Sequence, residues 1–133
     1  MENIKLNERL LTAVQFVREG SRLADVGTDH GYLPIFLILE GRISFAIAAD
    51  INRGPLDKAD ENIHKYALDG KIKTVLCDGL RSIDKDEVDD VAIFGMGGEL
   101  IVKILDEAPW LKKKKKRLIL QPMTHPEKLR KYL

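Results

Sequence analysis

The sequence has one cysteine, few aromatic residues and no long apolar segment. Because Cys77 is the only cysteine, no disulfide can form within the chain, and this favours a cytoplasmic protein. No run of about 18 apolar residues is present, and the opening "MENIKLNERL" lacks the apolar core of a signal peptide. We therefore expect neither a membrane span nor secretion.

Residues suited to metal binding or nucleophilic catalysis are also scarce. His30, His64 and His125 stand far apart, without the spacing of metal ligands, so no metal is expected. No histidine lies near Cys77 in the sequence, and we interpret this cysteine as a small buried residue at a strand end rather than a nucleophile.

The net charge of +1 hides a segregation of charge along the chain. Residues 112–133 hold nine Lys or Arg and one acid, which leaves 13 basic and 20 acidic residues in the first 111. Such asymmetry hints at an anionic partner for one face of the protein. The alternative is that "LKKKKKRL" is a solvated loop that keeps the entry to a strand soluble.

The order of apolar segments predicts the fold class. At 133 residues and 44% hydrophobic, the chain is long enough for one domain with its own core. Short apolar runs alternate with amphipathic segments that end at glycine or proline. The expected strands are residues 22–26, 44–49, 72–77, 91–94 and 117–121, and the expected helices are residues 7–20, 31–40, 55–70, 98–108 and 124–133. This alternation predicts a Rossmann-like, three-layer α/β/α domain with a mainly parallel sheet.

Local signals suggest how some of these elements begin and which side chains they bury. The first helix is expected to bury Leu10, Leu11, Val14 and Val17. Thr124 and Glu127 stand at capping-box spacing before the last helix, and the acidic "RSIDKDEVDD" is expected to be a surface link.

The glycine turn "DVGTDHG" after the first strand decides between two kinds of ligand. A dinucleotide fingerprint needs three glycines, so that the backbone can approach a pyrophosphate. With Gly27 as the first, the second position falls on Asp29 and the third on Tyr32. A carboxylate at the second position would repel and crowd a diphosphate, so a nicotinamide or flavin dinucleotide is disfavoured.

S-adenosylmethionine suits this turn better, because it has no phosphate and carries a sulfonium and an ammonium group. Asp25 or Asp29 can accept from the ammonium, Asp50 can accept from the ribose hydroxyls, and Asp78 can accept from the adenine amino group. Any one of these acids could be a turn or cap residue, but all of them follow consecutive strands. The expected cofactor-binding set is Asp25, Gly27, Asp29, His30, Gly31, Asp50, Ile51, Asp78, Gly79, Gly95 and Met96.

A second glycine cluster, "FGMGGEL", follows the fourth strand. Gly95, Gly97 and Gly98 form either a tight strand-to-helix turn or a backbone without side chains that leaves room for a flat base.

Together these motifs resemble one family, the bacterial tRNA (adenine(22)-N(1))-methyltransferases known as TrmK. The resemblance is carried by "GSRLADVGTDHGYLP", "GPL", "CDGL", "GMGGELI" and "RLILQP", in this order. It implies a Rossmann-like methyltransferase domain followed by a helical, coiled-coil-like domain, with S-adenosylmethionine as donor and N1 of an adenine in the tRNA D-arm as acceptor. Residues 1–133 would then be a truncated methyltransferase domain, without the terminal strand hairpin and the helical domain, and Lys112 to Arg117 would be a candidate tRNA contact.

The chemistry of that reaction is compatible with the absence of a His or Cys constellation. Adenine N1 has a lone pair and no proton, so attack on the sulfonium methyl needs no base to begin, and positioning supplies most of the acceleration. Asp29 and Tyr32 are the candidate residues beside the acceptor. Two alternatives remain open: methyl transfer to another RNA or a small molecule, and a non-catalytic module that binds S-adenosylmethionine.

Overall fold

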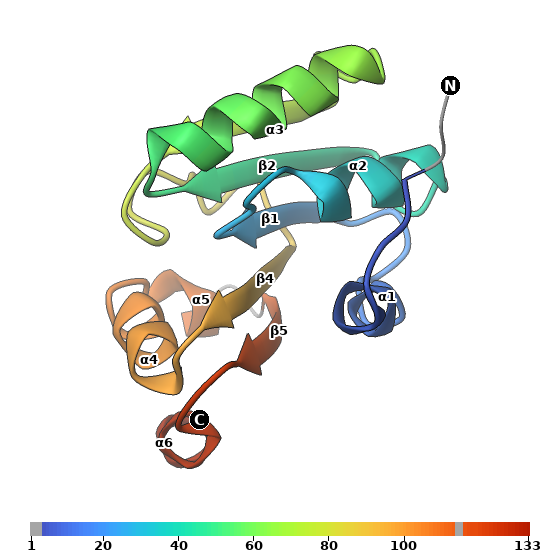
Figure 1. The fold of residues 1–133 in the computed structure, drawn as a ribbon. Helices are drawn as coiled ribbons and strands as arrows, with labels where there is room; N and C mark the ends of the chain where they lie inside the picture. Colours follow the sequence, from blue (N-terminus) through green and yellow to red (C-terminus); the bar gives the residue numbers. More distant parts are fainter. Residues whose placement is uncertain (1–3, 114–115) are drawn as a thin grey trace.

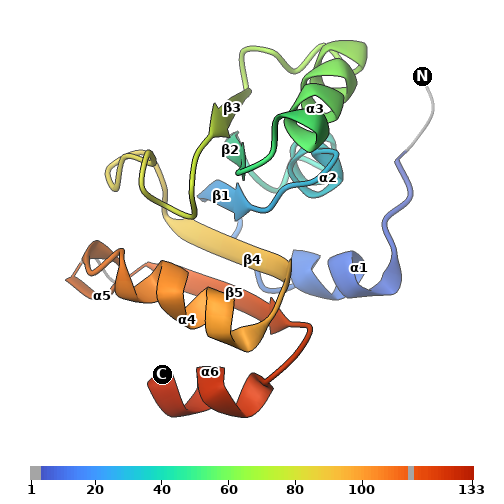
Figure 2. The same cartoon turned by 60° about the vertical axis from the view of Figure 1, so that its left-hand side comes forward.

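The computed structural model describes residues 4–113 and 116–133, which form one sheet covered by helices (Figures 1 and 2). The strands are β1 (Arg22–Val26), β2 (Phe45–Asp50), β3 (Ile72–Leu76), β4 (Asp90–Met96) and β5 (Arg117–Pro122). The helices are α1 (Glu8–Val14), α2 (Tyr32–Leu39), α3 (Arg53–Lys65), α4 (Gly98–Asp106), α5 (Trp110–Lys113) and α6 (Pro126–Tyr132). None of the helices described is long and apolar enough to cross a membrane.

All five strands are parallel, in the order β3-β2-β1-β4-β5, as the alternation of strands and helices predicted. The strand order therefore reverses between β1 and β4, and both neighbours of β1 are paired along its length. Val26 at the end of β1 pairs with Ala49 of β2 and Ile93 of β4. The turns that follow these strands are consequently gathered at one edge of the sheet.

Alternate residues of each strand enter two separate cores, which confirms the three layers. Leu23 and Ala46 belong to the core under α1 and α2, whereas their neighbours Ala24 and Ile47 belong to the core under α4. Burial on both faces explains why the central strands β1, β2 and β4 consist mostly of apolar residues. The helices α1, α2 and α3 lie on one side of the sheet, and α4, α5 and α6 lie on the other (Figure 2).

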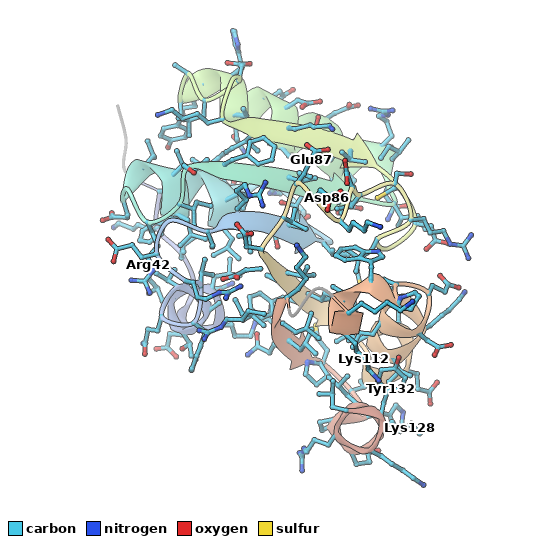
Figure 3. The ribbon with its side chains drawn as sticks, turned by 180° about the vertical axis from the view of Figure 1, so that it is seen from behind. Arg42, Asp86, Glu87, Lys112, Lys128 and Tyr132 are labelled. Atoms are coloured by element: carbon cyan, nitrogen blue, oxygen red, sulfur yellow. The ribbon has the colours of Figure 1, made fainter. Side chains whose placement is uncertain are left out.

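Helix α1 is shorter than predicted but firmly held. The Asn7 side chain accepts from the Leu10 backbone N–H at 2.9 Å and starts the helix. The helix ends at Val14 instead of continuing toward Gly20, and Leu11 is 46% exposed, so its predicted burial was wrong. After the helix, Arg42 donates to the carbonyls of Val17 and Gln15, and thereby fixes the chain that leads into β1 (Figure 3).

The end of the acidic link is not at the surface, contrary to prediction. Asp90 opens β4 and is fully buried, and its carboxylate accepts from the Arg18 guanidinium at 2.6 and 2.8 Å and from the Arg18 backbone N–H at 2.8 Å. Asp89 pairs with Arg22, and the hydrogen bond from that guanidinium lowers the pKa of Asp89 to about 2. These two ion pairs fasten the chain at and just before the start of β1 to the chain at and just before the start of β4.

Both ends of helix α3 differ from the prediction. The helix begins at Arg53, so Pro55 lies within its first turn, and it ends at Lys65 before Ala67 at φ 57° rather than at Gly70. Pro is tolerated in the first turn because the backbone N–H groups there have no partner within the helix.

Helix α6 has no capping box. It begins at Pro126 after His125, which has φ 50° and makes no side-chain cap, while the Thr124 carbonyl accepts from the Gly98 N–H at 2.6 Å. Thr124 is held by α4 and not by its own helix.

The basic segment Lys112 to Arg117 is not simply a loop. Lys112 and Lys113 end the short helix α5, which was not predicted, and Arg117 opens β5, while residues 114–115 lie outside the described part of the chain. The Lys112 ammonium lies 5.2 Å from the centre of the Tyr132 ring (Figure 3).

Candidate functional site

The turn after β1 forms the centre of the candidate site. The Ala49 carbonyl of β2 accepts from both the Gly27 and Thr28 N–H groups at 2.9 Å, so the turn is tied to the neighbouring strand. Three residues here have a left-handed backbone: Gly27 at φ 74°, Asp29 at φ 60° and Gly31 at φ 77°. A Cβ at Gly31 would lie 3.2 Å from the Ala59 Cβ of α3, so close approach of that helix as well as backbone conformation favours glycine there.

Asp25, the first acid of the motif, is buried under this turn. Its side chain is held by the Thr28 hydroxyl, which donates to Asp25 Oδ2 at 2.8 Å. Loss of solvation raises the pKa of Asp25 to about 7; the Thr28 hydrogen bond opposes the shift, and Asp50 and Asp29 add to it. A buried carboxylate with negatively charged neighbours favours the binding of a cationic ligand.

Asp50 ends β2 and is 8% exposed. Its two carboxylate oxygens accept from the backbone N–H groups of Asp29 at 3.2 Å and Asn52 at 2.9 Å. Each oxygen has a second lone pair, so the carboxylate can still accept from a ligand. Asp50 thus both fixes the glycine turn and faces the site.

Asp29, His30 and Tyr32 form the more open side of the turn. The Asp29 side chain is 74% exposed and lies 3.7 Å from the His30 ring nitrogen. The rings of His30 and Tyr32 meet edge to face with their centres 5.5 Å apart, and Tyr32 is 41% exposed. Exposed aromatic faces of this kind can stack against a base.

Two adjoining pockets contain these residues. The smaller, of about 70 Å³, is lined by Val26, Gly27, Asp50, Ile51, Cys77, Asp78, Gly79, Met96, Leu100 and Ile104. The larger, of about 280 Å³, is lined by Asn7, Arg9, Leu10, Asp25, Gly27, Thr28, Asp29, His30, Tyr32, Leu33, Phe94 and Gly95. Gly27 lines both. Of the cofactor-binding residues predicted from the sequence, all of which the structure describes, only Gly31 lines neither pocket, because it packs against α3.

Two different features favour glycine at the remaining glycine positions of the site, close packing and a left-handed backbone. A Cβ at Gly27 would lie 2.8 Å from the Met96 methyl, and a Cβ at Gly79 would lie 3.1 Å from Ile104 of α4, so these two glycines allow close packing. Gly95, at φ 74°, faces open space. The role of Gly79 beside an adenine ring therefore stays a prediction.

In the second glycine cluster, two of the three glycines, Gly97 and Gly98, are needed for close packing. A Cβ at Gly97 would lie 2.6 Å from the Thr124 hydroxyl, and one at Gly98 would clash with the His125 carbonyl. The chain between β5 and α6 therefore fills the space beside Gly97 and Gly98. The interpretation that this turn leaves room for a flat base was wrong at these two glycines.

Cys77 is buried beside the smaller pocket, where its thiol lies 3.3 Å from the Gly79 carbonyl. Burial raises the pKa of this thiol, which makes the thiolate scarce at neutral pH. The structure thus agrees with a small core residue. Across the residues described, His, Cys, Asp and Glu form no group of three suited to a metal ion.

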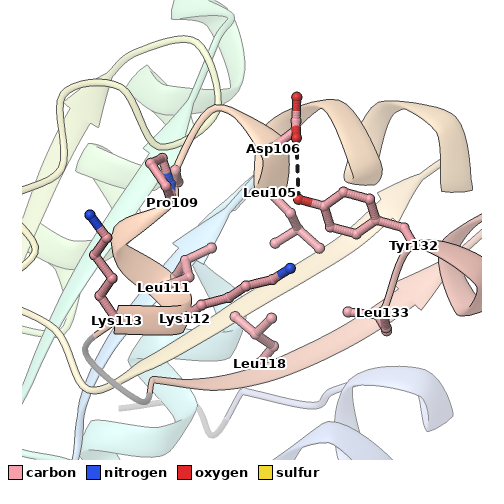
Figure 4. Close-up of a pocket in the computed structure, with 10 residues that line it drawn as sticks. Leu105, Asp106, Pro109, Leu111, Lys112, Lys113, Leu118, Tyr132 and Leu133 are labelled. Carbon is pink, nitrogen blue, oxygen red and sulfur yellow. Dashed lines mark hydrogen bonds between the residues drawn. The ribbon is translucent and has the colours of Figure 1, made fainter.

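A further pocket of about 320 Å³ lies toward the other end of the sheet, between α4, α5, β5 and α6 (Figure 4). It is lined mainly by apolar side chains such as Leu105, Leu111 and Leu118, and the Tyr132 hydroxyl reaches Asp106 at 3.5 Å. Leu118 is near the start of β5, whereas the glycine turn follows the end of β1. This pocket is therefore separate from the candidate site.

The sequence did not reveal that α1 belongs to the site. Asn7, Arg9 and Leu10 line the larger pocket, although they precede the first strand and carry no recognisable motif. Their place depends on how α1 packs against the sheet, which no local pattern specifies.

Comparison with known proteins identifies the family. A family model described as a methyltransferase domain matches residues 6–133. The chain is 40% identical over 133 residues to the tRNA (adenine(22)-N(1))-methyltransferase of Bacillus subtilis, covering all of this chain and 56% of that protein. The crystal structure of the B. subtilis m1A22 tRNA methyltransferase TrmK matches with a TM-score of 0.90 and 41% identity, over 97% of this chain and 55% of that one.

A second structure carries a ligand. The Streptococcus pneumoniae protein Sp1610, in complex with S-adenosyl-L-methionine, matches with a TM-score of 0.89 and 40% identity, over 97% of this chain and 61% of that one. The chain thus spans little more than half the length of these relatives. The match of the family model over nearly the whole chain, together with the parallel sheet and the acidic glycine turn, shows that the chain belongs to the methyltransferase-domain family.

Proposed function

We propose that this chain is the S-adenosylmethionine-binding domain of a tRNA methyltransferase that modifies N1 of adenine 22. The observation that carries the proposal is the meeting of Asp25, Asp50 and Asp78 around Gly27, at the carboxyl ends of three neighbouring strands. The B. subtilis relative, 40% identical by sequence and 41% in its crystal structure, bears the name of this activity.

The residues present fit the donor. Asp50 has lone pairs for the ribose hydroxyls, and Asp78 lies exposed beside buried Gly79 at the wall where we place the adenine. Ile51 and Leu100 are exposed apolar side chains of the same pocket and would contact the ring. When bound, S-adenosylmethionine supplies an electrophilic methyl group on a sulfonium, and the negative turn favours that positive charge.

We place the acceptor on the open side of the turn. Asp29 and Tyr32 are exposed there, and the ring pair of Tyr32 and His30 offers a surface for stacking a base. Because adenine N1 carries no proton, these residues would orient the base and exclude water from it, without removing a proton.

In this proposal the chain binds the donor, and other parts of a full-length protein supply most of the tRNA contacts. Every residue assigned to the donor lies between Asp25 and Leu100, inside the described part of the chain. Folded RNA is recognised through shape and many phosphate and 2′-hydroxyl contacts, which need a wider surface. We therefore infer that residues 1–133 bind the donor but methylate tRNA poorly, and that Lys112 to Arg117 attract tRNA in the full-length protein. A cytoplasmic location stays a prediction.

The test has two steps. Calorimetry with S-adenosylhomocysteine and with NAD should show binding of the first alone by residues 1–133. Unmodified tRNA is then incubated with labelled donor and either this chain or the full-length protein, at equal donor saturation, and its nucleosides are analysed by mass spectrometry. We expect 1-methyladenosine with the full-length protein and little or none with residues 1–133. Binding of NAD, or a methylated product at another position, would contradict the proposal.

A further inference from the structure

Gln121, near the end of β5, has a buried side-chain oxygen without a hydrogen-bond partner. Of the buried side-chain nitrogens and oxygens in residues 4–113 and 116–133, two lack a partner, Ser21 Oγ and Gln121 Oε1. Ser21 precedes β1, at the edge of the sheet opposite the glycine turn, whereas Gln121 is the last residue but one of β5, at the carboxyl edge. A buried acceptor without a partner costs stability, and a ligand that donates to it would explain why it is there.

The register of the sheet places Gln121 beside the larger pocket. Gln121 pairs with Phe94 of β4. Both side chains lie on the face covered by α1 and α2, because Ile119, two residues earlier in β5, belongs to the core under these helices and Phe94 packs against it. Phe94 lines the larger pocket together with the ring pair of His30 and Tyr32. Neighbouring strands are about 4.8 Å apart, so Gln121 is one strand away from this wall of the pocket.

The end of β4 beside Gln121 leaves open space. The pairing of β4 with β5 is irregular between Phe94 and Met96, so Gly95 is an extra residue between them. Its backbone is left-handed, at φ 74°, and a Cβ there would meet nothing within 4 Å. The edge of a flat base can therefore approach the carboxyl ends of β4 and β5 at this point.

The carboxamide of Gln121 is within reach of such a base. The oxygen is buried, but the residue as a whole is only partly buried. The last torsion of a glutamine side chain is broad, so a rotation about it can turn the oxygen toward a ligand without moving the strand.

A glutamine carboxamide matches one edge of adenine. Its oxygen accepts from the N6 amino group while its NH₂ group donates to N7. N1 lies on the other edge of the base and stays free to attack the methyl group. Guanine has acceptors at both O6 and N7, so it would leave the glutamine oxygen without a donor. We propose, building on the function above, that Gln121 binds N6 and N7 of the acceptor base and thereby selects adenine.

Other polar side chains near the larger pocket fit this role less well. Asp29 and Asp50, as carboxylates, accept hydrogen bonds but cannot donate to N7. Asn7 has a carboxamide and lines the pocket, but its oxygen already accepts from the Leu10 N–H at the start of α1. Gln121 combines a donor with an acceptor that has no partner in the described chain.

An adenine analogue and an isosteric variant test the contact together. In 7-deazaadenine a carbon replaces N7, while N1 and the amino group remain. The full-length protein is assayed on tRNA that carries adenine or 7-deazaadenine at position 22. For the wild type, we expect the analogue to lower kcat/KM roughly tenfold, the effect of one lost hydrogen bond. Gln121→Met should lower kcat/KM for adenine by roughly 10- to 100-fold and show no further loss with the analogue.

Stability and donor binding are measured on the same variant. Methionine has nearly the volume of glutamine and no buried polar group, so Gln121→Met should keep or raise the melting temperature. It should also bind S-adenosylhomocysteine with wild-type affinity, because Gln121 does not line the smaller pocket, where we place the adenosine. Gln15→Ala is the matched control, since Gln15 is exposed at the end of α1 and lines neither pocket of the site. It should change neither kcat/KM nor the response to the analogue.

Three results would overturn the proposal. If the wild type does not respond to the analogue, N7 is not contacted at all. If Gln121→Met responds as strongly as the wild type, another group contacts N7. If Gln121→Met melts at a lower temperature and loses S-adenosylhomocysteine affinity in parallel with kcat/KM, Gln121 supports the structure instead of reading the base.

The same assay separates this inference from the proposed function. If the wild-type full-length protein forms no 1-methyladenosine at position 22, the proposed function is wrong, and the role of Gln121 is refuted with it. If methylation occurs but the selection of the base is the same in Gln121→Met, the function stands and only the role of Gln121 is refuted.

Discussion

Replacing Asp25 by asparagine tests the charge at the centre of the site through protein stability. Burial raises the pKa of this carboxyl from 3.8 to about 7, so between these values the folded state holds a proton that the unfolded state has lost. A carboxyl whose pKa is raised on folding therefore removes stability as pH rises from the unfolded value to the folded one, and the loss is complete above it. An asparagine at this position would not titrate, while its carbonyl could still accept from Thr28.

The magnitude follows from the two pKa values. Between pH 5 and pH 8, ionisation of Asp25 should remove about 3 kcal/mol from the free energy of unfolding of the wild type and nothing from that of Asp25→Asn. Other titrating groups, including Asp89 with its pKa of about 2, are common to both proteins and cancel in the difference.

The assay is urea denaturation of both proteins at half-unit steps from pH 5 to pH 8. The difference between the two free energies of unfolding should grow in favour of Asp25→Asn as pH rises, and most of the change should occur below pH 7. Parallel curves would refute the argument, because they would mean that Asp25 is solvated in the folded state. Asp57→Asn, which removes an exposed carboxylate of α3, serves as the control for the loss of a surface acid.

Four other outcomes are expected. Asp50→Ala should weaken S-adenosylhomocysteine binding by roughly 1–3 kcal/mol in calorimetry, and unchanged affinity would place the ribose elsewhere. Arg18→Ala should lower the free energy of unfolding by about 3 kcal/mol in urea, since it leaves a buried carboxylate without its guanidinium, and a loss within error would contradict that pairing. Gly98→Ala should cost about 1–3 kcal/mol through crowding against the turn before α6, while Gly70→Ala, whose Cβ meets nothing within 4 Å, should cost far less in the same thermal melts. Neutralising Lys112 and Lys113 in the full-length protein should flatten the salt dependence of tRNA binding, and an identical slope would leave them as solubility residues.

The strands could be predicted closely because their signal is local. "RLADV" is a short apolar run with a polar start and a glycine after it, and β1 covers those five residues, Arg22–Val26. A central strand of a parallel sheet is buried on both faces, so most of its residues are apolar and its limits are visible. The same logic placed Asp50 at the end of β2 and Asp78 after β3.

Two of the wrong predictions, for Asp90 and Thr124, concern contacts that join distant parts of the chain. Asp90 reads as the last residue of an acidic surface link, and only its pairing with Arg18, 72 residues away, explains its burial. Thr124 has the spacing of a cap, but its carbonyl is used by Gly98 of α4. Local pattern cannot show such partners, because each depends on which elements the sheet brings together.

The same limit explains why one side of the larger pocket was missed. The acids of the glycine turn were identified from their spacing, but Arg9 is brought to them by the packing of α1, with Asn7 and Leu10 as its local supports. A helix without a motif can therefore complete a site that a motif begins.

The buried acid beneath the glycine turn has a cost in stability that function can explain. A carboxyl at Asp25 with a pKa of about 7 lowers stability at neutral pH, and an apolar or amide side chain would avoid this loss. A bound ammonium or sulfonium reverses the balance, since it stabilises the ionised carboxylate in a site of low dielectric. Binding of such a cation should then release a proton from Asp25 at about pH 6, and affinity should rise as the pH approaches the pKa of about 7. A phosphate-bearing ligand would show the opposite dependence, so the same turn that excludes a dinucleotide also ties the binding of a cationic ligand to pH.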